Sequence, residues 1–199
     1  MKIVTTIFAA LLFFSLQAQN GYSVGDKATD FKLKNVDGSM VSLADFNESK
    51  GFVVIFTCNH CPYVIAYEDR IIELDKKYKK LGYPVIAINP NDETIVPGDS
   101  FEGMVKRANE KGFTFPYLRD KTQEIANAYG AQRTPHVYLL NKEGDDLVVR
   151  YIGTIDDNYK DASLVTKTYL SDAIDALLEG VNPDPDFTKA IGCSIKRKS

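Results

Sequence analysis

The chain has 199 residues, which is enough for one domain with short appendages. Apolar residues make up 44% and charged residues 26%, as in globular domains that bury a core, and this excludes a disordered chain. The formal net charge is -3, so no basic surface is available for phosphate backbones. We therefore expect no nucleic-acid partner.

Residues 1–19 have the pattern of a cleavable signal peptide. Lys2 is followed by an apolar run over residues 7–16 and then by the small, polar exit Gln17-Ala18-Gln19. The run is shorter than the roughly 20 apolar residues that span a bilayer, although an uncleaved anchor is the alternative. We expect a periplasmic or secreted protein that is not stably inserted in the membrane after cleavage.

The first half of the mature chain predicts a hairpin and a βαβ unit. Residues 20–50 are predicted to be β-rich, with a hairpin turn at Asp37-Gly38. Two unbroken apolar runs, 52–56 and 84–88, are typical of parallel strands buried on both faces. Apolar residues spaced three and four apart predict a helix between them, over 64–81. The crossover between the two strands should be right-handed.

The second half predicts further helices and an antiparallel strand pair. Helices are expected over 99–112, over 120–130 and, with an apolar stripe that starts at Leu164, over 164–178. Residues 113–118 should be extended, and 136–140 should pair with 147–152 around a turn at 141–144. The sequence thus predicts an α/β fold, with a mixed central sheet, helices on both faces and an N-terminal β-hairpin extension. The expected domain is 20–182, and 183–199 form a C-terminal tail.

Two of the three cysteines, Cys58 and Cys61, lie at the junction of the first buried strand and its helix. A disulfide framework would use more, scattered cysteines, so this spacing indicates redox chemistry. A sulfur at a helix N-terminus faces unpaired N–H groups and the positive end of the helix dipole, which lower a cysteine pKa to about 3.5–7.5. We expect Cys58 to be the exposed, attacking thiolate and Cys61 to be the deeper, resolving thiol.

His60 lies directly before Cys61 and is the third expected catalytic residue. A protonated imidazole there would stabilise the Cys58 thiolate and therefore the reduced state. The pair should be more oxidising than one without this histidine.

A metal site is the alternative interpretation of the cysteine pair. Zinc would need two more ligands, and no second pair exists. A copper-binding chaperone remains open if the fold brings His136 close to Cys58 and Cys61. If the cysteine pair is a redox site, we expect neither a cofactor nor a metal. Cys193 is either a free thiol in a mobile tail or a third redox residue that folds back toward Cys58.

Strand, CxxC and helix, followed by Thr134-Pro135 before an antiparallel strand pair, resemble the thioredoxin superfamily. The resemblance extends over about 24–180 and is nearest to the redoxin branch of that superfamily, which includes peroxiredoxin-like proteins. The C-terminal sequence from Gly192 to Lys196 also resembles that branch. It implies that Pro135 is cis and that Thr134 contacts the substrate chain. Peroxiredoxins carry Thr or Ser three residues before the reactive cysteine, where this chain has Ile55, so a thiol peroxidase is a weaker alternative.

The leading prediction is a thiol–disulfide oxidoreductase that exchanges disulfides with protein thiols outside the cytoplasm, together with an unidentified redox partner. Its direction, oxidising or reducing, stays open. The strand 52–56 has no acid that could take the proton of Cys61, and Glu68 and Asp69 are expected on a solvated helix face. Tyr63, Tyr67 and Phe101 are expected to be core residues, with a substrate groove as the alternative.

Overall fold

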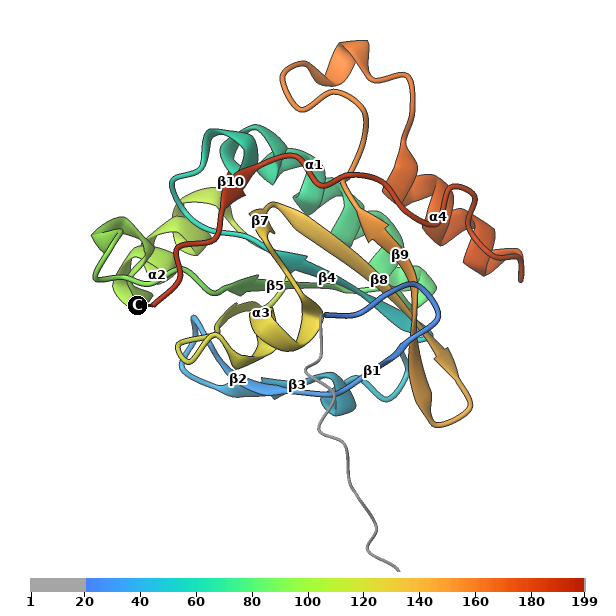
Figure 1. Ribbon diagram of the computed structural model, residues 1–199, viewed down its shortest axis with the longest axis horizontal. Helices are drawn as coiled ribbons and strands as arrows, with labels where there is room; N and C mark the ends of the chain where they lie inside the picture. Colours follow the sequence, from blue (N-terminus) through green and yellow to red (C-terminus); the bar gives the residue numbers. More distant parts are fainter. Residues whose placement is uncertain (1–20, 199) are drawn as a thin grey trace, which may run out of the picture.

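The computed structural model describes residues 21–198, so the expected signal peptide lies outside the described residues. One sheet runs through the domain in the order β1-β9-β8-β4-β5-β6-β2-β3 (Figure 1). Its strands are β1 (Lys27–Ala28), β2 (Lys32–Asn35), β3 (Met40–Ser42), β4 (Gly51–Phe56), β5 (Val85–Asn89), β6 (Tyr117–Arg119), β8 (His136–Glu143) and β9 (Asp146–Gly153). A separate two-stranded pair joins β7 (Arg133–Thr134) to β10 (Cys193–Ser194).

The pairing confirms a mixed sheet. The apolar strands β4 and β5 are parallel, β5 is also parallel to β6, and every residue of β4 and β5 is buried. β8 pairs antiparallel with β4 on one side and β9 on the other. The predicted N-terminal hairpin is β2 and β3, which joins the far edge through β6. Unbroken apolar runs form the centre because both of their faces are covered.

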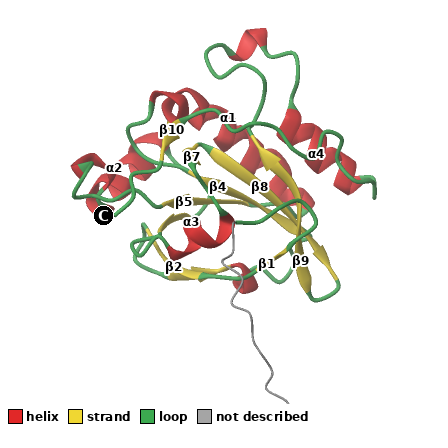
Figure 2. Ribbon diagram, viewed as in Figure 1, coloured by secondary structure: helices red, strands yellow, loops and turns green. Residues whose placement is uncertain are grey.

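Helices cover both faces of this sheet, as predicted (Figure 2). The helices are α1 (Pro62–Tyr78), α2 (Phe101–Lys111), α3 (Glu124–Tyr129) and α4 (Tyr169–Leu178). Residues of α1, α2 and α4 pack into one apolar core, and residues of α3 pack into the core on the opposite face. Tyr67 is fully buried in the first core, whereas Tyr63 and Phe101 are half-buried.

The helices begin at positions that differ from the predicted ones, and α3 begins four residues late, at Glu124 instead of 120. α2 begins after Ser100, whose hydroxyl accepts a hydrogen bond from the Gly103 N–H, and this leaves Asp99 free for other contacts. α4 begins at Tyr169, and Leu164 is 62% exposed in a short 3₁₀ turn, so the predicted stripe was wrong at that end. The leucine matches the helical period, but it lies on a loop that leaves the core.

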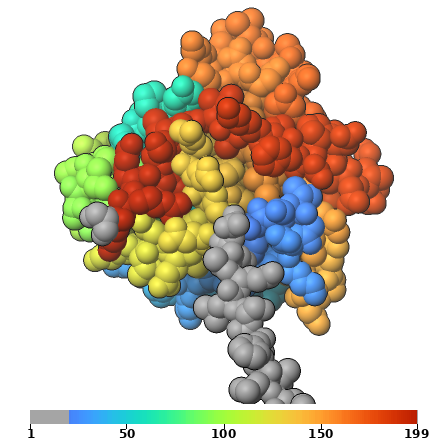
Figure 3. Space-filling view, viewed as in Figure 1, coloured from blue at the N-terminus to red at the C-terminus, as the bar shows by residue number. Residues whose placement is uncertain are grey.

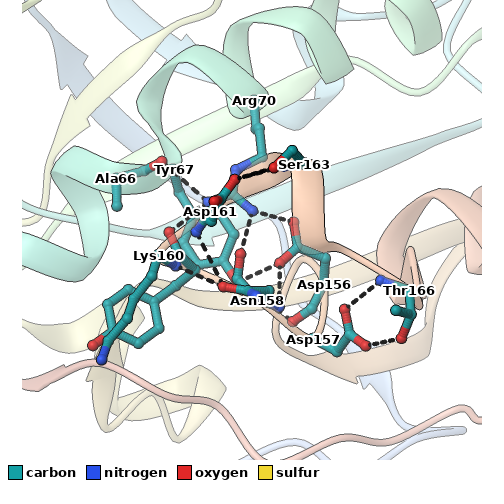
Figure 4. Close-up of polar contacts among 11 residues, drawn as sticks. Ala66, Tyr67, Arg70, Asp156, Asp157, Asn158, Lys160, Asp161, Ser163 and Thr166 are labelled. Atoms are coloured by element: carbon teal, nitrogen blue, oxygen red, sulfur yellow. Dashed lines mark hydrogen bonds and ion pairs between the residues drawn. The ribbon is translucent and has the colours of Figure 1, made fainter.

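That loop is tied to α1 by Arg70 (Figure 4). The guanidinium of Arg70 donates to the Asp156 carboxylate at 2.6 Å and to the backbone O of Asn158 at 2.7 Å. Tyr67 Oη donates to the other Asp156 oxygen at 2.8 Å. The contacts fix the segment after β9 beside α1.

The C-terminal segment crosses from α4 over the β9 end of the sheet to β7 and ends near α2 (Figure 1). On the surface it lies between residues of the first turns of α1 and the β7 region (Figure 3). Within residues 21–198, no helix has both the length and the apolar composition needed to cross a bilayer.

Candidate redox site

The two cysteines flank the turn between β4 and α1. Cys61 is the residue that precedes the helix, with extended φ and ψ of -67° and 125°, and Pro62 occupies the first helical position. A proline suits that position because its missing N–H would have no helical partner. Cys58 and Cys61 are both free thiols, and they pack together with Val64 in a small apolar cluster.

Thr134 contacts both sulfurs from the opposite side. Its hydroxyl lies 3.3 Å from Cys58 Sγ, and its backbone O lies 3.2 Å from Cys61 Sγ, where a protonated Cys61 can donate to it. The Thr134–Pro135 peptide bond is cis, as the resemblance implied. The fold therefore brings the loop of Cys58 and Cys61 next to the loop of Thr134 and Pro135. The two loops are at least 73 residues apart in the sequence.

The expected difference in exposure between the two cysteines is not observed. Cys58 is 2% exposed and Cys61 is 0% exposed, and Tyr63 and Cys193 pack against the cluster that both cysteines form with Val64. Cys193 itself is half-buried in contact with this cluster. The prediction of an exposed Cys58 was wrong, since residues distant in the sequence, Thr134 and Cys193, pack against the pair.

The pKa values of the two cysteines are shifted in opposite directions. Hydrogen bonding with the Cys58 thiol is the main cause that lowers the pKa of Cys61 to about 4. Burial opposes this shift, whereas the Cys193 thiol and the N–H groups of Val64 and Cys193 support it. The same bond to Cys61, burial and the Asp99 carboxylate raise the pKa of Cys58.

His60 is held by a buried carboxylate. Its Nδ1 lies 2.8 Å from Asp99 Oδ2, and the Asp99 side chain has no exposed surface. Asp99 also accepts hydrogen bonds from the backbone N–H of Asn59 and from Asn91 Nδ2, each at 2.7 Å. His60 is therefore paired with a carboxylate beside Cys58 rather than facing the sulfur as an isolated cation. Nothing in the sequence pattern pointed to Asp99.

The copper alternative that used His136 is wrong. In the described part of the chain, the only group with metal-like spacing is Cys58, His60 and Asp99, whose ligand atoms lie within 4.8 Å of one another. His136 is paired with Phe56 in the sheet, and its ring packs 4.8 Å from that of Tyr138, beside a different surface cavity. The Asp99 oxygens are already occupied by Asn59, Asn91 and His60, which accounts for their burial without a metal.

Glu68 is a further residue that sequence reasoning misplaced. It is 2% exposed, and Arg107 binds its carboxylate through Nε and Nη2 at 2.6 and 2.5 Å. Glu68 and Cys58 line the same small internal cavity of about 10 Å³. Its neighbour Asp69 is 85% exposed, as predicted for a solvated face. The available signal was the position of Glu68 on the apolar stripe of α1, between Val64 and Ile71.

A cysteine pair at the start of a helix, opposed by a cis-proline loop on a mixed sheet, defines a thioredoxin-like dithiol site. The chain belongs to the AhpC/TSA family, whose pattern matches residues 24–152. It is 26% identical over 121 residues to a thiol-disulfide oxidoreductase ResA from Halalkalibacterium halodurans; the match covers 61% of this chain and 64% of that protein. The chain thus spans slightly less than two thirds of this relative.

Solved structures confirm the predicted fold. A crystal structure of an uncharacterized conserved protein from Geobacillus kaustophilus is 42% identical, with a TM-score of 0.81 and coverage of 90% of this chain and 94% of that one. The thioredoxin domain of a thiol-disulfide oxidoreductase from Bacteroides vulgatus is 18% identical, with a TM-score of 0.54 and coverage of 67% and 91%. The second match supports the thioredoxin-like fold alone.

Proposed function

We propose that this protein is a thiol–disulfide oxidoreductase that exchanges disulfides with protein thiols outside the cytoplasm. The observation that carries the proposal is the contact of Cys58 and Cys61 with one residue, Thr134, directly before the cis-Pro135. The ResA name of a relative supports the same activity. The apolar run of residues 7–16 supports export.

The proposed reaction begins when Cys58, as a thiolate, attacks a disulfide of the partner. A Cys58–partner disulfide forms, and the second partner sulfur leaves as a thiolate. Cys61 then attacks Cys58 Sγ, the partner sulfur leaves, and the Cys58–Cys61 disulfide remains. The partner gains two electrons and the enzyme loses them; the same steps in reverse oxidise a partner dithiol.

Thr134 is proposed to assist both steps. Its hydroxyl lies 3.3 Å from Cys58 Sγ, and this contact lowers the pKa of that thiol, which opposes the effect of burial. Its strand β7 is short, and its backbone can pair with an extended chain, as it does with β10 in this structure. His60 is proposed to balance the Asp99 carboxylate when the reduced pair carries negative charge. Ile55, fully buried in β4, supplies no hydroxyl at the peroxidase position.

Trapping tests the proposal. Cys61→Ser should leave partners bound to Cys58 through a disulfide that a reducing agent releases, since the resolving thiol is absent. Cys58→Ser is the matched control and should trap at least about tenfold less. Peroxide consumption coupled to a thiol reductant should stay at the level of Cys58→Ser. Equal trapping by both variants, or peroxide turnover without disulfide exchange, would reject the proposed function.

A further inference from the structure

The C-terminal segment is held on the domain at both of its ends. Upstream, the Thr188 N–H donates to the backbone O of Ile152 at 2.9 Å, and the Thr188 hydroxyl contacts Tyr151 Oη at 2.6 Å. Downstream, the Lys196 backbone accepts from the side chain of Gln123 at 2.8 Å, and Ile195 is buried in the core. Between these anchors, Cys193 packs against the cluster of Cys58, Cys61 and Val64.

Between the anchors the segment pairs with the loop that faces the dithiol. Cys193 is opposite Thr134 and Ser194 is opposite Arg133, in the antiparallel pair β7–β10. The Ile195 N–H continues the pairing by donating to the backbone O of Gln132 at 3.1 Å. This is the arrangement in which an extended peptide adds to a free strand edge. The chain's own tail thus occupies the edge proposed for partner docking.

Close packing fixes the register of the tail. A Cβ on Gly192 would lie 2.2 Å from the Thr134 O and 2.7 Å from its carbonyl carbon, so only glycine lets the two backbones approach this closely. Cys193 follows immediately, and its side chain is directed into the cysteine cluster. A larger residue at 192 should lift the tail without removing any sulfur.

Cys61 is the sulfur of the pair that shares a neighbour with Cys193. Cys193 packs against the cluster of Cys58, Cys61 and Val64, and it lies opposite Thr134, whose backbone O accepts from Cys61 Sγ at 3.2 Å. Exchange requires the attacking sulfur to approach the sulfur that it attacks, and the shared contact with Thr134 favours Cys61 as the sulfur that Cys193 approaches. The structure therefore refines the expectation that Cys193 folds back toward Cys58.

We infer that the tail is an intramolecular substrate of the dithiol, and that Cys193 is a third redox-active residue that exchanges with the Cys58–Cys61 disulfide at Cys61. The Cys193 thiolate attacks Cys61 Sγ, the Cys61–Cys58 bond breaks, and Cys58 takes up the proton that Cys193 lost. One disulfide and one thiol are present before and after, so no oxidant is consumed. The inference rests on the proposed disulfide exchange.

The exchange would also regulate access. The Cys61–Cys193 form holds β10 covalently on β7 and closes the docking edge, whereas the Cys58–Cys61 form retains the tail through hydrogen bonds alone. Partners can pair with β7 only after the tail has left. Cys193→Ser should therefore accelerate reduction of a protein disulfide, by at least about threefold, because the closed form can no longer accumulate.

Trypsin separates the two disulfides by mass. Residues 51–70 carry both Cys58 and Cys61, and residues 190–196 carry Cys193, so only a bond to Cys193 links two tryptic peptides. After equilibration in glutathione buffer, acid quenching and alkylation, Cys58→Ser should give this linked pair at least about tenfold more than Cys61→Ser. Wild type should show both the linked pair and the internal disulfide of 51–70.

Gly192→Val keeps all three sulfurs and is the matched test of placement. It should lower the linked pair at least about tenfold, leave the Cys58–Cys61 disulfide in place, and accelerate alkylation of the reduced pair. Equal linkage in Cys58→Ser and Cys61→Ser, or undiminished linkage in Gly192→Val, would overturn the inference while leaving the proposed function intact. Absence of the Cys58–Cys61 disulfide and of turnover would instead reject the proposed function itself.

Discussion

Asp99 and His60 should shift the reduction potential of the dithiol in opposite directions. The reduced pair carries a negative charge once one thiol ionises, and the disulfide carries none. The Asp99 carboxylate disfavours the reduced state and raises the pKa of Cys58, in addition to the larger effects of the bond to Cys61 and of burial. A protonated His60, 2.8 Å from Asp99, offsets that carboxylate. Asp99→Asn should raise the potential, and His60→Ala should lower it.

The size of the shift follows from the separations. Cys58 Sγ, the His60 nitrogen and the Asp99 oxygen lie within 4.8 Å of one another. Two unit charges at that distance interact by about 3.5 kcal/mol at an effective dielectric constant near 20. His60 and Asp99 carry opposite charges, so each cancels part of the other's interaction energy with the thiolate. About 1–2 kcal/mol should therefore remain. For a two-electron couple this corresponds to roughly 20–40 mV.

Equilibration with glutathione buffers of known ratio measures these shifts, with the disulfide quantified in the tryptic peptide 51–70. Asp69→Asn is the matched control, because it removes the same charge from an 85% exposed position, and its shift should stay below about 5 mV. Thermal unfolding reports any loosening of the loop around Asp99. Shifts of the same sign in Asp99→Asn and His60→Ala would refute the electrostatic reasoning, because a general loss of structure affects both variants alike.

Two further predictions concern stability. Arg107→Met leaves the buried Glu68 carboxylate with only Lys111, 3.4 Å away, and should cost about 3 kcal/mol in guanidinium unfolding. The exposed ion pair of Lys106 with Glu110 provides the control, and Lys106→Met should cost less than about 1 kcal/mol. Equal costs for the two variants would contradict the burial of the ion pair between Arg107 and Glu68. Burial lowers the pKa of His136 to about 4, so the unfolded chain binds a proton first as the pH falls below about 6.5. Stability should therefore fall between pH 7 and 4.5, by about 2 kcal/mol more in wild type than in His136→Gln; parallel pH profiles of the two proteins would contradict this.

Local sequence was sufficient for the central elements. The apolar runs that became β4 and β5 and the apolar stripe of α1 predicted their types and order, because burial of both faces or of one stripe is a property of consecutive residues. The same pattern located Cys58 and Cys61 at the start of a helix. The partner loop at Thr134-Pro135 followed from resemblance rather than from spacing, and the structure contains the implied cis bond.

The contacts that set the chemistry of the site were not predictable in this way. Asp99 contacts His60, and Arg107 contacts Glu68, and in both pairs the residues are 39 positions apart in the sequence. The first pair lies just before α2 and α1, and the second joins the two helices. A charged residue near the end of a loop or on a helix stripe has no local signal that names its partner. Glu68 was accordingly placed in solvent by its type, although its position on the stripe favoured burial.

The sequence by itself determined a redox-type cysteine pair at a strand–helix junction of an α/β domain, since charge, helix dipole and periodicity act over a few residues. Tertiary structure alone decided that both sulfurs are buried and which residues pack against them. Those properties depend on Cys193 and Thr134, which reach Cys61 only when β10 pairs with β7. Burial and hydrogen bonding at the pair are set by distances in space, and the order of residues along the chain does not specify them.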